Sequence, residues 1–281
     1  MSPRPVAIVL SGGGAKTAAH LGAARAVGEA GLVPARYVAT SMGAVMAAGL
    51  AAGIAGAALL ERLTGIGRQG IVRDPLAVVS GLYTRSLLRP GPFRRAVEAL
   101  VPARRFRDLS APLTVAVVDL DTGELLLFGD GGEDAPLVDV LCATCALPLY
   151  FGPVRIDGRR CGDGGLRGVL PLEAAARVAT EPVIAVDVGP GFDTPPGQAA
   201  AVPPVVRAHD DAVGTLMAAL TAASVSAWRS DPNRPPLLYV RPPVERNATF
   251  QVDRMQQYAE DGYRAVQLHL TATPFGANSA T

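Results

Sequence analysis

The sequence has little charge for its length and almost no excess of either sign. Charged residues make up 18% of the 281 residues, and the formal net charge is +1. A protein that binds nucleic acid through its charge needs a basic face, so this balance gives no support for a nucleic-acid partner. Hydrophobic residues reach 49%. That content excludes a disordered chain, because disordered chains lack the apolar residues whose burial offsets the entropy of folding.

Cysteine is also scarce. Three cysteines (Cys142, Cys145 and Cys161) are too few for a disulfide scaffold and are typical of a reducing compartment. Cys142 and Cys145 have the spacing of a redox or zinc pair, but no second pair follows them. We interpret them as small core side chains and expect neither a metal site nor a cofactor. Lysine occurs once, at Lys16, and arginine supplies the other basic residues, a composition typical of GC-rich bacterial genomes.

We also expect no segment that directs the chain to or through a membrane. The first residues lead into a short apolar run without the pattern of a signal peptide, so we expect a cytoplasmic protein. Residues 38–60 carry no charge and are long enough to cross a bilayer. They consist mostly of Ala and Gly, whose transfer energy is small, and we interpret them as elements packed on a sheet.

The order of apolar patterns predicts an α/β fold with a mainly parallel sheet. A buried strand at 5–10, a helix at 17–30, a strand at 37–40 and a helix after Ser41 form one βαβ unit. Further strands are predicted at 113–118, 124–128, 154–156, 159–161, 182–188 and 237–241, and helices at 205–228 and 250–270. We expect one domain over 1–270, a flexible tail at 271–281, a surface loop at 189–204, and a cap or lid at 65–92, where Gly and Pro interrupt every pattern.

Ser41 is the candidate nucleophile. It lies in Ala-Thr-Ser-Met-Gly (39–43), between an apolar strand and a helix of small residues, which is typical of a nucleophile elbow. An ordinary serine cap on a buried helix is the alternative. Gly12, Gly13 and Gly14 end the preceding strand at the same edge of the sheet, where their N–H groups could bind an oxyanion. Phosphate-binding motifs fit poorly, because a P-loop and a dinucleotide fingerprint both require glycines that are absent.

Two aspartates are candidate bases, since Asp-Gly-Gly occurs at Asp130 and at Asp163. Asp130 closes a hairpin next to other acidic residues, which favours a solvated turn. Asp163 follows a second short hairpin and precedes an apolar helix. A triad of Ser41, Asp163 and either His209 or His269 has the chain order of α/β-hydrolases, but both histidines lie in helix patterns.

Several blocks in order make the sequence similar to the patatin-like phospholipase family. They are LSGGGAKTAAHLG (10–22), ATSMGA (39–44), VDLDTGELLLF (118–128) with ATCALPLYFGPV (143–154), and GDGGLRGVLPL (162–172); AEDGYRAVQ (259–267) is similar to the usual C-terminal helix. The resemblance implies a three-layer αβα fold with the elbow after the second strand. It also implies a Ser41–Asp163 dyad that uses no histidine.

The same resemblance implies a serine acyl hydrolase acting on (phospho)lipids or related acyl esters, with transient contact to a membrane surface. In that case the oxyanion hole comprises Gly12, Gly13, Gly14 and Ala15, and Lys16 and Met42 contact the substrate. Burial in an apolar cleft would raise the basicity of the dyad carboxylate.

The Asn that often follows Asp-Gly-Gly in the family is absent at 167–168, and two further positions depart from the family pattern. Thr17 and Ala39 stand where the family usually has glycine. These departures leave open a biosynthetic acyltransferase or thioesterase that uses the same acyl-serine, and a non-catalytic binding protein.

Overall fold

A mostly parallel sheet forms the centre of the protein. The computed structural model describes residues 4–68, 88–191, 203–245 and 251–272. The strand order is β5-β6-β3-β2-β1-β7-β8, and β4 also pairs with β3. The pairs that link β1, β2, β3, β7 and β8 are parallel, and β4, β5 and β6 pair antiparallel. The strands are β1 (Arg4–Leu10), β2 (Leu32–Ala39), β3 (Leu113–Asp119), β4 (Leu125–Gly129), β5 (Val154–Ile156), β6 (Arg159–Asp163), β7 (Val183–Val186) and β8 (Leu237–Val240).

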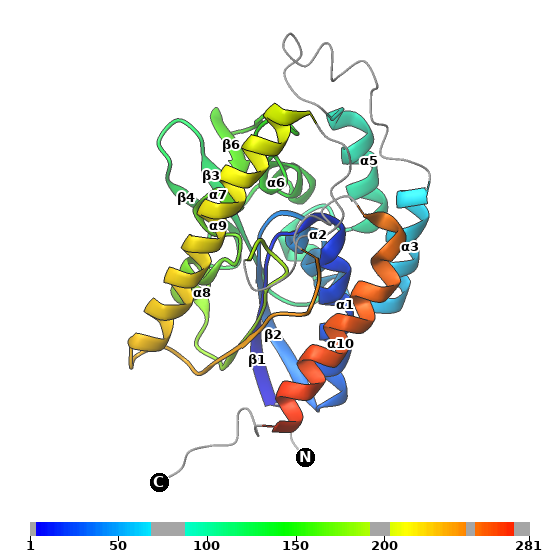
Figure 1. Cartoon of the computed structure of the whole chain (residues 1–281), viewed down its shortest axis with the longest axis vertical. Coiled ribbons are helices and arrows are strands. Elements are labelled where there is room, and N and C mark those ends of the chain that lie inside the picture. The colour runs from blue at the N-terminus through cyan, green and yellow to red at the C-terminus, as the bar shows by residue number, and fades with distance from the viewer. Residues whose placement is uncertain (1–3, 69–87, 192–202, 246–250, 273–281) are drawn as a thin grey trace.

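Helices cover both faces of the sheet, as the three-layer prediction requires (Figure 1). One face carries α1 (Ala18–Glu29), α2 (Ser41–Ala51), α3 (Gly56–Arg68), α5 (Pro90–Leu100), α6 (Leu137–Thr144) and α10 (Met255–Ala272). The other face carries α7 (Gly165–Gly168), α8 (Leu172–Val178) and α9 (Pro204–Ser230). Short 3-10 turns are η1 (Gly14–Thr17), η2 (Phe106–Asp108) and η3 (Val252–Arg254).

The central strand β1 explains why its sequence is a continuous apolar run. Val6, Ile8 and Leu10 belong to the core between the sheet and α1, α2 and α10. Ala7 and Val9 belong to the second core, under α8 and α9. Successive side chains of a strand point to opposite faces, so a strand covered on both faces has no polar side.

Glycines bring α10 directly against α1. A Cβ atom on Gly22 would lie 1.7 Å from the carbonyl oxygen of Ala259, and one on Gly262 would lie 2.0 Å from that of Ala19. The two helices therefore touch through their backbones, and they run side by side in Figure 1. This contact holds α10 against η1, the turn through which the glycine loop enters α1.

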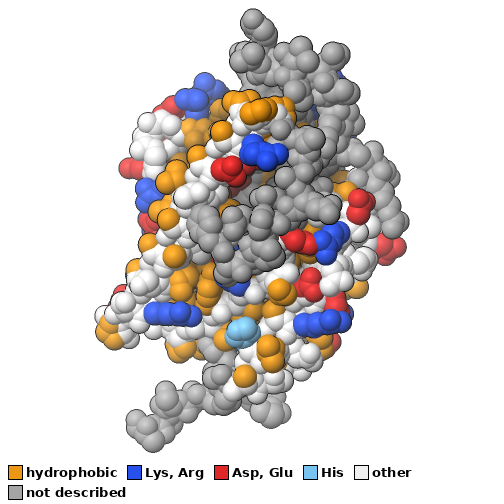
Figure 2. All heavy atoms as spheres, viewed as in Figure 1, with side chains coloured by type: hydrophobic (Ala, Val, Ile, Leu, Met, Phe, Trp, Pro, Cys, Tyr) orange, Lys and Arg blue, Asp and Glu red, His pale blue; other side chains and the backbone are white. Residues whose placement is uncertain are grey.

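Helix α9 has an unusual outer face. No charged residue lies between Asp211 and Arg229, and Val205, Leu216 and Leu220 are 70%, 65% and 40% exposed. Figure 2 shows apolar side chains gathered along this helix. Among the described helices, none is long and apolar enough to cross a membrane. The uncharged stretch at 38–60 is divided between β2, α2 and α3.

The predicted strands, hairpins and helices of the described residues are confirmed with shifts of a few residues, except in the second strand and in the segment 65–92. The second strand begins at Leu32 rather than at 37, because it pairs with β1 over its whole length. The ends of 65–92 are helical, in α3 and α5, while 69–87 lie outside the described residues. So do 192–202 of the predicted loop and 273–281 of the predicted tail. Asp130 lies in the turn after β4, as predicted, and its partly exposed side chain accepts a 2.6 Å hydrogen bond from Arg36.

Candidate active site

Ser41 occupies a tight turn where β2 enters α2. Its φ of 52° lies in the left-handed region, which a residue with a side chain adopts only at a cost in energy. The turn also brings α2 against the end of β1. A Cβ atom on Gly43 would lie 2.2 Å from the carbonyl oxygen of Ser11, so only glycine fits there. These are the features of the predicted elbow.

Asp163 directly contacts the Ser41 side chain. Ser41 Oγ donates a 2.8 Å hydrogen bond to Asp163 Oδ2, and the N–H of Gly165 donates one of 2.8 Å to Asp163 Oδ1. Asp163 ends β6 and pairs with Val117 of β3. A Cβ atom on Gly164 would lie 2.2 Å from the carbonyl oxygen of Ala116. The glycine after Asp163 therefore lets the carboxylate approach the end of β2.

Burial raises the basicity of the Asp163 carboxylate. The side chain is 3% exposed, and desolvation raises its pKa from 3.8 to about 7. The hydrogen bonds from Gly165 and Ser41 favour the charged form and oppose this shift only in part. A carboxylate with a pKa near 7 can accept a proton from a neighbouring hydroxyl far more readily than one near 4.

The N–H groups of the glycine loop differ in whether they already have a hydrogen-bond acceptor. The N–H of Gly12 donates a 2.9 Å hydrogen bond to the carbonyl of Val169, so the prediction that Gly12 supplies an oxyanion donor was wrong. A Cβ atom on Gly12 would lie 2.9 Å from the Cβ of Ser41, so this glycine makes room for the Ser41 side chain. The N–H groups of Gly13, Gly14 and Ala15 have no acceptor among the described residues. Gly13 and Gly14 are half-buried, and the φ of Gly14 is 60°.

The structure accommodates Thr17 and Ala39, which replace glycines of the family pattern, without disturbing Ser41. Thr17 donates a 2.6 Å hydrogen bond to the carbonyl of Gly14, which closes the loop on itself. The methyl group of Ala39 is fully buried in the sheet, where β2 pairs with both β1 and β3.

Lys16 lies inside the protein. Its side chain is 2% exposed, and burial lowers its pKa to about 8 although the nearby charge of Asp187 raises it. Asp187 also accepts a 2.8 Å hydrogen bond from Tyr239 and pairs with Arg241. The predicted contact between Lys16 and substrate does not fit this buried position. Met42 is half-buried against the core, and its role stays a prediction.

The histidines have partners away from the Ser41–Asp163 pair. His20 is fully buried, and its Nε2 donates a 2.8 Å hydrogen bond to the carbonyl of Ser11. Desolvation lowers the pKa of His20 to about 4. His209 contacts its neighbour Asp210, and His269 contacts the carbonyl of Ala265 within α10. Among the described residues, no histidine is hydrogen-bonded to Asp163.

Sequence reasoning missed Thr144, a neighbour of Ser41. The N–H of Ser41 donates a 2.8 Å hydrogen bond to Thr144 Oγ1. Cys145, the next residue, is buried, and burial raises the pKa of its thiol well above its ordinary value. The three cysteines are free, and Cys145 and Cys161 are buried, as predicted for core side chains. The available clue was the polar Thr144 at the end of an apolar helix pattern.

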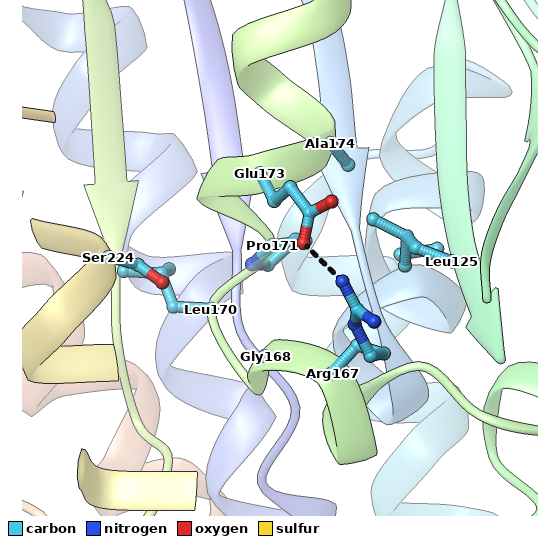
Figure 3. A pocket seen from close by; sticks show the side chains of 9 residues that line it. Leu125, Arg167, Gly168, Leu170, Pro171, Glu173, Ala174 and Ser224 are labelled. Atoms are coloured by element: carbon cyan, nitrogen blue, oxygen red, sulfur yellow. Dashed lines mark hydrogen bonds and ion pairs between the residues drawn. The ribbon is translucent and has the colours of Figure 1, made fainter. Parts of the chain in front are cut away.

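Other hollows and clusters lie apart from this pair. Figure 3 shows a small hollow of about 10 Å³ beside α8 and α9, where Arg167 contacts Glu173. A wider one of about 390 Å³ is lined by Phe106, Arg107 and Asp130 among others. Ser41 and Asp163 line neither of them. Within the described residues, no group of three or more His, Cys, Asp or Glu side chains could hold a metal ion.

The fold and the site together define an α/β protein with a serine at a strand–helix elbow, hydrogen-bonded to a buried aspartate beside a glycine loop. The chain belongs to the patatin-like phospholipase family, whose sequence model matches residues 8–176.

Several known proteins are similar to this chain. An uncharacterized NTE family protein of Mycobacterium bovis is 30% identical over 201 residues, which cover 69% of this chain and 53% of that protein. A second such protein of the same species is 27% identical over 96% of this chain and 47% of its own length. The chain thus spans about half the length of these relatives.

Patatin-like phospholipase domain-containing protein 6 of Mus musculus is 27% identical over 67% of this chain and 14% of its own length. The crystal structure of VipD from Legionella pneumophila has a TM-score of 0.48 at 17% identity, over 96% of this chain and 67% of VipD.

Proposed function

We propose that this protein is a serine acyl hydrolase that cleaves acyl esters of phospholipids or related lipids through Ser41 and Asp163. One observation carries the proposal: Ser41 Oγ donates a 2.8 Å hydrogen bond to a carboxylate whose pKa is raised to about 7. A nucleophile needs a base within hydrogen-bonding distance, and a base is most effective when its pKa lies near the working pH.

Acylation begins with the Asp163 carboxylate accepting the Ser41 proton while Oγ attacks the ester carbonyl carbon. The carbonyl oxygen gains negative charge, which the N–H groups of Gly13 and Gly14 stabilise by hydrogen bonds. The C–O bond to the leaving alcohol then breaks. Asp163 returns its proton to that alcohol, and the acyl group remains on Ser41.

Deacylation repeats the same steps with water. Asp163 accepts a proton from the water molecule as its oxygen attacks the acyl-Ser41 carbonyl. When the intermediate collapses, Ser41 Oγ leaves, recovers the proton from Asp163, and the free acid departs. One buried carboxylate thus serves as base and acid in each half of the cycle, with no histidine.

A lipid substrate is supported by family membership and by the surface of α9. The family and the mouse relative are described as phospholipases. Leu216 and Leu220 expose apolar side chains within the uncharged stretch of α9, and Val205 exposes one near the start of the helix. Such a face suits transient contact with a lipid surface.

Hydrolysis of a short p-nitrophenyl ester and labelling by a fluorophosphonate test the proposal. Ser41→Ala and Asp163→Asn should each lose turnover while their circular dichroism stays native. Labelling should modify Ser41, and Ser226→Ala, which changes an exposed serine on α9, should behave as the unaltered protein. Normal turnover in either site variant would exclude the dyad.

Two further outcomes separate the alternatives. Turnover should survive in His209→Ala and in His269→Ala; a large loss in a folded variant would favour a triad. A radiolabelled acyl-enzyme should decay in water alone, whereas one that persists until an alcohol is added would indicate an acyltransferase.

A further inference from the structure

The C-terminal end of α6 is attached to both members of the Ser41–Asp163 pair. Thr144, the last residue of α6, accepts the 2.8 Å hydrogen bond from the N–H of Ser41. Ala146 accepts a 3.1 Å hydrogen bond from the N–H of Asp163. Thr144 and Ala146, two residues apart, thus bind the backbone N–H groups of Ser41 and Asp163, which are far apart in the sequence.

The hydroxyl group of Thr144 uses all of its hydrogen-bonding capacity. It donates to the carbonyl of Ala116 at 2.6 Å, accepts from Ser41, and lies 3.2 Å from the hydroxyl of Thr40. A hydroxyl has one hydrogen to donate and two lone pairs, and Thr40 can fill the second lone pair. Thr144 is completely buried. Its oxygen is therefore held between β3, the elbow and α6.

The Ser41 N–H has no other acceptor available from its own helix. The first N–H groups of a helix lack partners inside the helix, and Thr40, which precedes α2, makes no capping bond with its side chain. Ser41 also has the left-handed φ of 52°, which persists only where surrounding contacts impose it. The bond to Thr144 is such a contact, and it acts on the residue that carries the nucleophile.

We propose that Thr144 is a positioning residue for the nucleophile: its hydroxyl holds the Ser41 backbone in the conformation that directs Oγ to Asp163. This inference rests on the proposed function. Thr144 acts through the Ser41 backbone. Without its oxygen, the N–H of Ser41 loses the acceptor that it has in this structure, and the elbow relaxes away from the geometry that proton transfer to Asp163 requires.

The test compares three variants with the unaltered protein. Thr144→Val keeps the shape of the side chain and removes the hydroxyl, and Thr144→Ser restores the hydroxyl without the methyl group. Thr114→Val is the matched control, because Thr114 is equally buried on β3 but donates to the carbonyl of Asp130 at 2.6 Å, at the other end of the strand. Turnover of a p-nitrophenyl ester, the rate of fluorophosphonate labelling and thermal unfolding are measured for each.

We expect kcat and the labelling rate of Thr144→Val to fall together by about tenfold or more, with KM unchanged. Thr144→Ser should recover to within about twofold, and Thr114→Val should lose thermal stability but keep kcat. The pH at half-maximal kcat should stay close to that of the unaltered protein in Thr144→Val, because burial is the main cause of the raised Asp163 pKa and the hydrogen bond from the N–H of Gly165 does not involve Ser41.

Three results would overturn the inference: an unchanged labelling rate in Thr144→Val, a loss in Thr144→Ser as large as in Thr144→Val, or an equal loss of kcat in Thr114→Val. If Thr144→Val does not fold, Thr144→Cys replaces it, since a thiol is a weak acceptor. A folded Thr144→Cys protein with the full rate would also overturn it. Failure of the unaltered protein to label or turn over would instead contradict the proposed function.

Discussion

Because the pKa of Asp163 is raised, activity and stability should change in opposite directions as the pH rises. The carboxylate is the form that accepts the serine proton, so turnover should rise as Asp163 ionises, with its midpoint near pH 7. Burial disfavours this charged form in the folded protein but not in the unfolded chain. The folded state therefore holds its proton more tightly, and the protein loses stability as the pH rises from about 4 to about 7.

The size of the effect follows from the two pKa values. A rise from 3.8 to about 7 corresponds to about 4 kcal/mol, at about 1.4 kcal/mol for each pH unit. Asp163→Asn removes the titration and keeps the hydrogen-bonding pattern, because the amide can donate to Ser41 Oγ and accept from the N–H of Gly165. The stability of Asp163→Asn relative to the unaltered protein should therefore grow by about 4 kcal/mol between about pH 4 and pH 8.

Two assays measure these opposite trends. Urea unfolding across this pH range gives the free energy of unfolding of each protein. Turnover of a p-nitrophenyl ester, corrected with the Ser41→Ala blank, should be about tenfold lower at about pH 6 than at about pH 8. Asp211→Asn serves as the control, since Asp211 is exposed on α9 and its change should leave both pH profiles as they are.

The reasoning would be refuted by a stability difference between Asp163→Asn and the unaltered protein that is constant with pH. A rate that does not change between about pH 5 and pH 8 would refute it as well, because the base would then have an ordinary carboxyl pKa.

Two more predictions concern glycines in close contact with other atoms. Gly12→Ala should abolish turnover in a folded protein, because the new methyl group would lie 2.9 Å from the Ser41 Cβ; full activity in this variant would show that the elbow has more room than the structure gives it. Gly22→Ala should destabilise the protein by about 3 kcal/mol or more by forcing α1 from α10, whereas Gly28→Ala on the same helix meets no atom and should stabilise it by about 0.5–1 kcal/mol. Equal unfolding temperatures for Gly22→Ala and Gly28→Ala would contradict the backbone contact.

Local patterns were sufficient for most elements and indicated Ser41 and Asp163 as candidates, whereas their pairing was implied by the family resemblance. The apolar runs at β1 and β7 and the turn residues between β5 and β6 depend on neighbours in the sequence, which is why their prediction succeeded. Ser41 and Asp163 each lie in a short motif with a steric reason for its glycines. The predicted second strand was too short because the polar Arg36 interrupts its apolar pattern, and that residue is explained by its ion pairs with Asp130 and Glu181.

The chain's own order of residues thus determined the α/β class, the elbow and the candidate base. The tertiary structure decided everything that depends on hydrogen bonds between distant segments. It assigned the Gly12 N–H to Val169, enclosed Lys16 beside Asp187, and brought Thr144 to the backbone of Ser41. The physical reason is that a polar group buried on folding must find a partner, and the partner's place in the sequence is set by the packing of helices and strands rather than by local pattern.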